Sequence, residues 1–239
     1  MTQRHPGGEK ATERGMELAG LGEGARILDV GCGEGETLDY LGRRGMKAEG
    51  IEINLAKVSA ARERFPGIPV KFGDGEFLDD YLSFTFDGVL MEHSLSQINM
   101  PDEALHEAYC VMKKGGKLII TDLYEIDPDP EQVRAVGMEA DRVSRLPHQE
   151  GDCEDRGMKY VSFRFGGAFF REPLIRQLEE TGFSVIAFED RTADLEEYLA
   201  GAGGDGETAL KELNPGLEMD AGGKKRRIGS FLLAAAKPL

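Results

Sequence analysis

Glycine occupies every second position directly after an apolar run near the start of the chain. The run Ile27-Leu28-Asp29-Val30 leads into Gly31-Cys32-Gly33-Glu34-Gly35. In such a turn the backbone can approach a ligand closely, because side chains at the glycine positions would block that approach. Asp29 can face a cationic group through water or through the amides of the turn. The turn therefore predicts contacts with a nucleotide-like ligand from Asp29, Gly31, Cys32 and Gly33.

Two nucleotide ligands fit a turn of this kind. A dinucleotide fingerprint places its third glycine five residues after the first, but that position holds Glu36, and the third glycine is Gly35. Pyrophosphate also prefers the bare positive start of a helix, where Glu34 and Glu36 would add negative charge. The methionine end of S-adenosylmethionine carries an ammonium and a sulfonium, which acids attract. The pattern favours S-adenosylmethionine as the cofactor, with a turn that only joins strand to helix as the alternative.

Two further acids follow the next two apolar runs. Glu52 in Gly50-Ile51-Glu52-Ile53 comes about 20 residues after the turn, where nucleotide-binding sheets place the acid that accepts from the ribose hydroxyls. Asp74 lies between two glycines after the third run and can accept from an adenine amino group. Either acid alone is common at a strand end. Together with the turn they favour a nucleoside held by Glu52, Ile53, Gly73, Asp74 and Gly75.

The elements that must position these residues alternate between short apolar runs and helical stretches. This alternation is typical of strand-helix-strand units, and it predicts an α/β fold with a parallel sheet covered on both faces. We expect strands at Arg26 to Val30, Lys47 to Ile53, Val70 to Phe72, Phe86 to Met91 and Lys117 to Asp122. Their carboxyl ends share one edge, which is where open sheets bind ligands.

Helices are expected between these strands. Asn54 is a good N-cap for a helix that carries Leu55, Val58, Ala61 and Phe65 on one side. Met100 to Lys114 has Pro101 in its first turn and an apolar face that includes Met112. In the second half we expect a helix from Pro128 to Pro147, a helix from Phe169 to Thr181, a strand from Phe183 to Glu189, a helical stretch from Ala193 and a last strand from Ile228 to Ala236.

The motifs together resemble the class I S-adenosylmethionine-dependent methyltransferases, especially the small-molecule branch that includes quinone-biosynthesis enzymes. The resemblance covers roughly residues 26 to 122 and also includes Phe86-Asp87-Gly88-Val89-Leu90 and Val111-Met112-Lys113-Lys114-Gly115-Gly116-Lys117-Leu118. It implies a Rossmann-like three-layer sandwich, with a seven-stranded, mostly parallel sheet and an antiparallel last strand. It further implies a cofactor site at Gly31, Gly33, Glu52 and Asp74. After the fourth strand, Glu92-His93-Ser94 departs from the commoner Leu-His-His.

The loop after the fourth strand faces the methyl group in this fold. His93 is therefore our candidate general base, because imidazole titrates near neutral pH. A histidine that only contacts backbone at a strand end is an equally good interpretation. Met91 and Glu92 are predicted to contact the cofactor. Glu92 can also hold an amine substrate, or point the other way by the alternation of side chains along a strand.

Two aromatic side chains are candidates for the acceptor site. Tyr124 ends the fifth strand at the same edge, and His5 precedes Pro6-Gly7-Gly8 in a segment that can fold over the cofactor or remain a flexible terminus. His148 and Cys153 fall short of a structural zinc site, so we expect no metal. The basic run Lys224-Lys225-Arg226-Arg227 is interpreted as a gatekeeper before the last strand.

We expect one methyltransferase domain over residues 1–239, with an N-terminal cap at 1–22 and a helical lid at 125–168, where the polar stretch Pro147 to Lys159 has little to bury. The formal charge of -15 disfavours nucleic acid, and no window approaches the apolar length of a membrane span. Three widely spaced cysteines suit a reducing, cytoplasmic location. The sequence predicts methyl transfer to a small molecule. The alternatives are an NAD(P)-binding oxidoreductase and a non-catalytic cofactor-binding protein.

Overall fold

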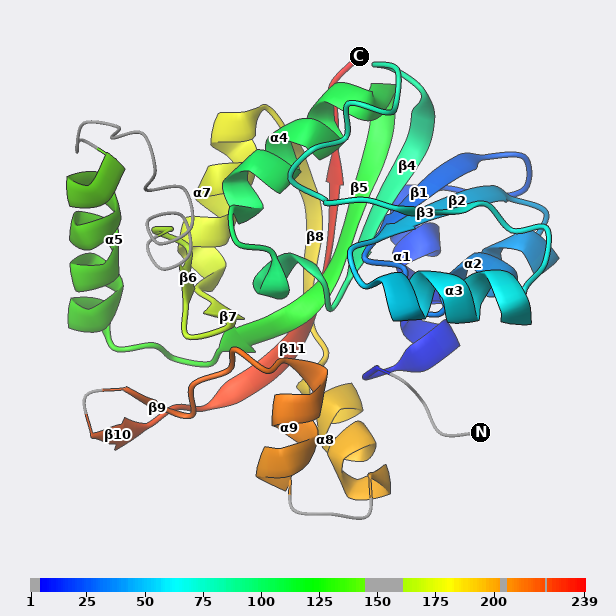
Figure 1. Ribbon diagram of the computed structural model, residues 1–239. Coiled ribbons are helices and arrows are strands. Elements are labelled where there is room, and N and C mark those ends of the chain that lie inside the picture. The colour runs from blue at the N-terminus through cyan, green and yellow to red at the C-terminus, as the bar shows by residue number, and fades with distance from the viewer. Residues whose placement is uncertain (1–4, 145–160, 203–205, 222) are drawn as a thin grey trace.

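The computed structural model describes residues 5–144, 161–202, 206–221 and 223–239 (Figure 1). The seven main strands are β1 (Arg26–Val30), β2 (Lys47–Glu52), β3 (Val70–Phe72), β4 (Phe86–Glu92), β5 (Met112–Glu125), β8 (Ser184–Asp190) and β11 (Ile228–Ala236). They lie in the order β3-β2-β1-β4-β5-β11-β8. The strands from β1 to β5 pair in parallel, and β11 pairs antiparallel with β5 and β8. The expected mostly parallel sheet with an antiparallel last strand is confirmed.

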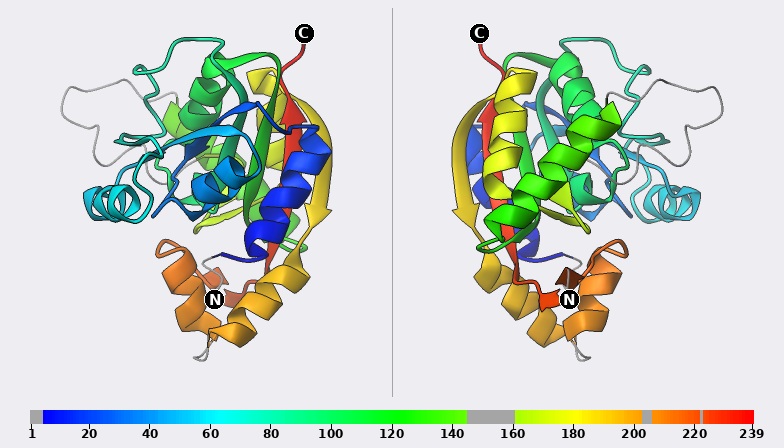
Figure 2. Two further views of the ribbon diagram at one scale, coloured as in Figure 1. Left: turned by 90° about the vertical axis from the view of Figure 1, so that its right-hand side faces the viewer. Right: turned by 90° about the vertical axis from the view of Figure 1, so that its left-hand side faces the viewer.

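Helices cover both faces of the sheet (Figure 2). The covering helices are α1 (Gly8–Ala19), α2 (Glu36–Arg43), α3 (Leu55–Arg64), α4 (Pro101–Val111) and α7 (Arg171–Thr181). Side chains of β4 alternate between the faces: Leu90 packs in a cluster with α1 and α2, whereas Val89 and Met91 pack with α4 and α7. This alternation explains why β4 is apolar at every position from Gly88 to Met91, as expected of a strand buried on both faces.

The second half of the chain adds elements around the carboxyl edge of the sheet. They are α5 (Pro130–Ser144), β6 (Arg164–Phe165), β7 (Ala168–Phe169), α8 (Thr192–Gly201), α9 (Gly206–Leu213), β9 (Asp220–Ala221) and β10 (Lys224–Lys225). The short strand β7 pairs with the end of β5 and extends the sheet to nine strands within the described residues. Helices α8 and α9 contact each other and lie together below the carboxyl ends of β4 and β5 (Figures 1 and 2).

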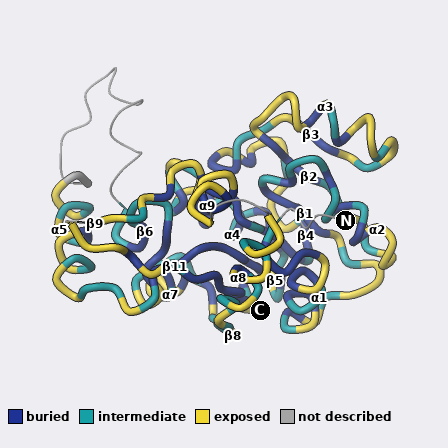
Figure 3. Tube along the Cα trace, turned by 90° about the horizontal axis from the view of Figure 1, so that it is seen from below, coloured by how far each residue is buried: buried dark blue, intermediate teal, exposed yellow. Residues whose placement is uncertain are grey.

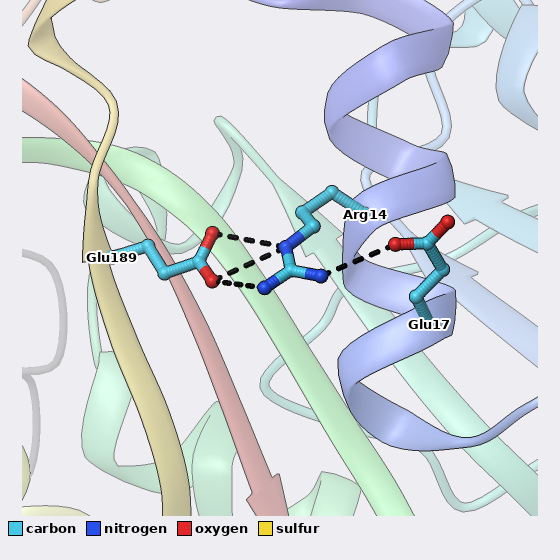
Figure 4. A network of polar contacts seen from close by, with 3 residues as sticks. All are labelled: Arg14, Glu17 and Glu189. Atoms are coloured by element: carbon cyan, nitrogen blue, oxygen red, sulfur yellow. Dashed lines mark hydrogen bonds and ion pairs between the residues drawn. The ribbon is translucent and has the colours of Figure 1, made fainter.

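Helix α1 holds the start of the described chain against the sheet. The guanidinium of Arg14 donates to both carboxylate oxygens of Glu189 on β8, with the shortest contact at 2.6 Å, and to Glu17 at 3.2 Å (Figure 4). Thr12, also on α1, donates to Glu92 on β4 at 2.8 Å. Contacts with residues distant in sequence therefore hold residues 8–19 against the sheet.

Several element boundaries differ from those expected. Helix α4 ends at Val111, and Met112 is the first residue of β5 rather than part of the helical face. Asn54 caps α3 by accepting from the amides of Ala56 and Lys57, as predicted, but Leu55 is exposed rather than part of the buried face with Val58 and Ala61. The β6–β7 hairpin was not predicted, because each of its strands has only two residues. Residues 145–160 of the lid expected at 125–168, with His148 and Cys153, lie outside the described part of the chain.

The trace is buried along the central strands and exposed on the outer turns of the helices (Figure 3). Arg226 of the basic run is itself buried and forms an ion pair with Glu125 at 2.8 Å, so this part of the run anchors the end of β5. Among the residues described here, no helix is both long and apolar enough to cross a membrane.

Candidate active site

A cavity of about 780 Å³ opens at the carboxyl ends of the parallel strands. Its size suits a small ligand. Most of the predicted site residues line it, namely His5, Asp29, Gly31, Cys32, Gly33, Glu52, Ile53, Gly73, Asp74, Gly75, Glu92 and His93. The structure thus brings together segments from β1, β2, β3, β4 and the start of the chain.

Two predicted site residues lie outside the lining of this cavity. Met91 is fully buried, because strand alternation directs it toward the α4 face. Tyr124 packs edge-on against Phe188 and Phe231, with ring centroids 5.6 and 6.0 Å away, so its ring belongs to the core. Neither side chain contributes a surface to the cavity.

The glycine turn adopts backbone conformations that require glycine. Gly31, Gly33 and Gly35 all have positive φ, at 81°, 57° and 88°. A Cβ on Gly31 would lie 2.5 Å from the Cβ of Ser94, so the turn packs directly on the loop after β4. A Cβ on Gly33 would meet nothing within 4 Å, which leaves the backbone at this position open to the cavity.

Glu52 connects the glycine turn to the start of α3. One carboxylate oxygen accepts from the amide of Gly33 at 3.0 Å, and the other accepts from the amide of Asn54 at 2.8 Å. The side chain is buried, yet it lines the cavity. A carboxylate oxygen has two lone-pair sites, so both oxygens can accept further bonds from a vicinal diol.

Asp29 is a buried carboxyl in a negatively charged environment. Burial raises its pKa well above the usual value, and the nearby carboxylates of Glu92 and Glu52 raise it further. The thiol of Cys32 is likewise held protonated, because burial and then Asp29 raise its pKa. The site therefore holds a carboxyl that a cation would ionise, beside an unreactive thiol.

Glu92 lines the cavity. Its two oxygens accept from the hydroxyls of Thr12 and Thr37, each at 2.8 Å, and Nε2 of His5 lies 3.9 Å from one of them. Glu92 thus ties α1, α2 and the segment before α1 to one corner of the cavity. Sequence spacing alone does not reveal these contacts, since Thr12 and Thr37 belong to different helices.

His93 is buried on the cavity wall, and neither of its ring nitrogens has a hydrogen-bond partner among the described residues. Burial lowers its pKa well below the usual value, and His5, with its ring centroid 5.8 Å away, lowers it further. The imidazole is therefore neutral at neutral pH. A buried, unpartnered nitrogen on a cavity wall is a functional feature to be explained, because such groups are costly to leave unbonded.

Asp74, predicted to accept from an adenine amino group, is held by its own turn. Asp74 accepts from the amide of Glu76 at 3.0 Å, and Glu76 in turn accepts from the amide of Met100 at 3.0 Å. A Cβ on Gly75 would lie 2.7 Å from Val30, so glycine allows this turn to pack against β1.

The second half of the chain supplies part of the lining that sequence reasoning missed. Tyr198 of α8 and Glu212 and Leu213 of α9 line the cavity. Gln97, the last residue of η1 (Leu95–Gln97), also lines it, as do Ile98 and Asn99 directly after η1. Gln97 donates to the backbone carbonyls of both His93, at 2.5 Å, and Leu213, at 3.3 Å. No local motif marks these residues, because their role depends on how α8 and α9 fold over the sheet edge.

The cavity is strongly acidic. The lining carboxyl groups among the described residues are Asp29, Glu34, Glu36, Glu52, Asp74, Glu76, Glu92 and Glu212. The lining lysine and arginine are Lys57 and Arg64, both on α3, and Arg64 pairs with Glu34 and Glu36. The described residues contain no cluster of three or more potential ligands that could hold a metal ion. The field in the cavity attracts cations.

Residues 28–120 match a family model described as a methyltransferase domain. The chain is 29% identical over 107 residues to a demethylmenaquinone methyltransferase of Renibacterium salmoninarum, covering 45% of each chain. It is 33% identical over 110 residues to a ubiquinone biosynthesis O-methyltransferase of Alkalilimnicola ehrlichii, covering 44% of each. An S-adenosyl-L-methionine-dependent Diels-Alderase of Talaromyces variabilis is 30% identical over 118 residues, covering 46% of this chain and 40% of that protein. The matches thus span less than half the length of these relatives.

Solved structures share the fold along nearly the whole chain. A putative sarcosine dimethylglycine methyltransferase from Galdieria sulphuraria superposes with a TM-score of 0.66 at 16% identity, covering 96% of this chain and 84% of that one. A geranyl diphosphate methyltransferase in complex with S-adenosylmethionine has a TM-score of 0.65 at 13% identity, with the same coverage. Residues 28–120 of this chain are therefore similar to a methyltransferase domain, within a fold that solved methyltransferase structures share.

Proposed function

We propose that this protein transfers a methyl group from S-adenosylmethionine to a small-molecule acceptor. The observation that carries the proposal is the presence, in one cavity, of the Glu52 carboxylate next to the glycine turn and of the buried, unpartnered imidazole of His93. The first suits a nucleoside, and the second suits an acceptor that must lose a proton. A site for the nicotinamide cofactor is not favoured, because the acidic turn opposes pyrophosphate.

The cofactor residues have separable roles. Glu52 accepts from the ribose hydroxyls, Asp74 accepts from the adenine amino group, and Asp29 faces the ammonium end. Ile53, largely exposed at the rim of the cavity, packs against the adenine ring. Gly31, Gly33, Gly73 and Gly75 let the backbone pass beside the ligand, and Cys32 packs beneath it as a protonated thiol.

When bound, S-adenosylmethionine supplies an electrophilic methyl group. The chain's contribution is to hold an acceptor oxygen or nitrogen in line with that methyl group, an effect worth up to ~7–11 kcal/mol. Nε2 or Nδ1 of His93 accepts the acceptor's proton as the new bond to carbon forms. The ring of His5 lies next to that of His93, with centroids 5.8 Å apart, and Nε2 of His5 is 3.9 Å from a carboxylate oxygen of Glu92.

The acceptor is neutral or cationic rather than anionic. Within the described lining, both cationic side chains lie on α3, at the cofactor end, whereas Tyr198 and Glu212 of α8 and α9 lie at the other end. A phosphate or diphosphate would meet carboxylates there, without an arginine among the described residues to pair with it. The overall charge of -15 opposes nucleic acid for the same reason.

Calorimetry with S-adenosylhomocysteine and with NADH tests the cofactor. We expect S-adenosylhomocysteine to bind and NADH not to bind; the reverse would overturn the proposal. Incubation with S-adenosylmethionine and a panel of phenols, catechols and amines then tests methyl transfer. Mass spectrometry must detect both a methylated product and S-adenosylhomocysteine, because a relative is named a Diels-Alderase that depends on the same cofactor. Cofactor binding without methyl loss across the panel would favour a non-transferring role.

A further inference from the structure

A buried chain of polar groups joins the loop after β4 to the end of α9. Asp122, on β5, accepts from the amide of Ser96 at 2.8 Å and from its hydroxyl at 2.6 Å. The side-chain amide of Asn214 donates to the same hydroxyl at 2.9 Å and to the carbonyl of Gly167 at 2.8 Å. All three side chains are almost completely buried. This series of hydrogen bonds therefore runs from Asp122 on β5, through Ser96 in the loop after β4, to Asn214 directly after α9.

The direction of these hydrogen bonds is fixed by chemistry. Burial raises the pKa of Asp122 to about 6, against the bonds from Ser96 and Leu123 that favour its charged form, so it is a carboxylate at neutral pH. A carboxylate only accepts, so the Ser96 hydroxyl must donate to it and must present a lone pair to Asn214. The Asn214 oxygen accepts from the amide of Gly216 at 2.9 Å, which leaves its amide nitrogen to donate to Ser96.

Arg164 reinforces the same loop from β6. Its guanidinium donates to the backbone carbonyls of Ser96 and Asn99, each at 3.0 Å, and of Ile98. The loop that receives these bonds begins at His93, whose φ of 51° is an uncommon conformation for a residue with a side chain. Such a conformation persists where the surroundings hold it in place. The polar contacts from β5, β6 and α9 provide that support.

We propose that Asp122, Ser96 and Asn214 form a latch that positions His93 relative to the α8–α9 wall of the cavity and so sets the geometry for the acceptor. The inference rests on the proposed function. Gln97 provides a second link between the same two segments, since its side-chain amide donates to the carbonyls of both His93 and Leu213. Leu213 and Glu212, just before Asn214, line the cavity together with Tyr198. Asp122, Ser96 and Asn214 are thus positioning residues. They act through His93 and through the α8–α9 wall of the cavity.

Within the described residues, the hydrogen bonds of the latch side chains do not reach the glycine turn or Glu52. The glycine turn is held instead by Ile51, whose carbonyl accepts from the amides of Gly31 and Cys32, and by Glu52. Ser94 supports this side, because its hydroxyl donates to the Val30 carbonyl at 2.6 Å and its Cβ packs on Gly31. Ser94 and Ser96 are thus two buried serines of one loop that face different halves of the site.

This pair of serines gives a matched test. Ser96→Ala removes the central bridge of the latch, and Ser94→Ala removes one buried hydroxyl from the cofactor side. With the acceptor that supports turnover, Ser96→Ala and Asn214→Ala should lower kcat/KM for the acceptor roughly tenfold or more and leave the Kd for S-adenosylhomocysteine within about twofold. Ser94→Ala should weaken S-adenosylhomocysteine binding instead. Equal losses of acceptor and cofactor affinity in Ser96→Ala would overturn the latch.

A second measurement needs no turnover. The proton–carbon ring signals of His93, assigned by their loss in His93→Gln, should move in both Ser96→Ala and Asn214→Ala. They should stay in place in Lys211→Met, which alters an exposed side chain of α9. Unmoved ring signals in folded latch variants would refute the inference. Moved signals in a protein that transfers no methyl group would support the latch while refuting the proposed function.

Discussion

At the scale of single residues, two acids beside the glycine turn have different environments. Glu52 accepts two backbone hydrogen bonds, one with each carboxylate oxygen. Asp29, buried next to Glu52 and Glu92, has a raised pKa instead. The two acids were both predicted from sequence as cofactor contacts, but their different environments give them different expected roles.

Glu52→Gln tests the ribose role. The change keeps the shape of the side chain and removes its charge, so binding of S-adenosylhomocysteine should weaken roughly 10- to 100-fold, as expected for bonds worth about 1.5–3 kcal/mol to a charged acceptor. Isothermal titration calorimetry measures this change. Glu49→Gln is the control, because Glu49 lies on the same strand and pairs with Arg26 at 2.8 Å, away from the cavity. Equal affinity in both variants would exclude Glu52 as a ribose ligand.

His93→Gln tests the proton acceptor. If His93 takes the acceptor's proton, kcat should fall by about two to four powers of ten, whereas the Kd for S-adenosylhomocysteine should stay within about threefold. Steady-state kinetics and calorimetry separate the two effects. His106→Gln, on the exposed side of α4, controls for a general effect of losing a histidine. Unchanged turnover in His93→Gln would remove His93 from the mechanism.

The raised pKa of Asp29 predicts that cofactor binding depends on pH. A cationic ligand stabilises the carboxylate, so binding should release a proton from Asp29 and affinity should rise as pH increases through the raised pKa of Asp29 in the free protein. Calorimetry of S-adenosylhomocysteine in two buffers of different ionisation enthalpy measures the released proton. Asp29→Asn should abolish the release. Methylthioadenosine lacks the ammonium end, and the same pH dependence with this ligand would contradict the assignment.

At the scale of elements, the N-terminal helix depends on partners that are distant in sequence. Thr12 is buried and donates to Glu92, 80 positions further along the chain. Thr12→Val should destabilise the protein by about 1.5–3 kcal/mol, because it removes a hydrogen bond to a buried carboxylate. Hydrogen exchange should speed up selectively in residues 8–19. The control is Thr37→Val, which removes an equivalent bond from α2 to Glu92 and should leave hydrogen exchange in α1 unchanged. Faster exchange of residues 8–19 in both variants would show that the bonds of Glu92 as a whole, rather than the Thr12 bond alone, stabilise α1.

The same dependence explains which elements could be predicted from the sequence. The bounds of β1, β3 and β11 match their predicted ranges, because apolar runs between turn residues carry the strand signal locally. Helix α1 was missed, since its polar segment becomes helical against Glu189 and Glu92. Helix α9 was missed for a similar reason: its buried Leu210 and Leu213 pack in a cluster with Leu123 and Ala168, which no local pattern reveals.

The candidate site likewise has one part that the local sequence reveals and one part that depends on distant contacts. The cofactor side comes from turns directly after strands, where type and spacing of residues are informative, so Asp29, Glu52 and Asp74 could be found from the sequence. The proposed acceptor side includes Tyr198 and Glu212, which line the cavity from α8 and α9. Tyr124 was assigned to this side because it ends β5 at the correct edge, but its ring packs into the core.

At the scale of the whole molecule, the formal charge of -15 and the acidic cavity act on the same ligand. S-adenosylmethionine has a net positive charge at neutral pH, whereas S-adenosylhomocysteine is a zwitterion without net charge. A field of this sign concentrates the cation near the cavity and speeds its association. It also favours exchange of spent cofactor, because the product lacks the charge that the field attracts.

Salt should therefore separate the two ligands kinetically. At about 0.15 M ionic strength the field decays over ~8 Å, so raising sodium chloride should slow association of S-adenosylmethionine several-fold and leave that of S-adenosylhomocysteine nearly unchanged. Surface plasmon resonance at a series of salt concentrations measures both rates. Glu212→Gln, which removes one acid of the cavity lining on α9, should reduce the salt slope for S-adenosylmethionine. Equal slopes for the two ligands would show that contacts with the bound cofactor, rather than the long-range field, select the charged methyl donor.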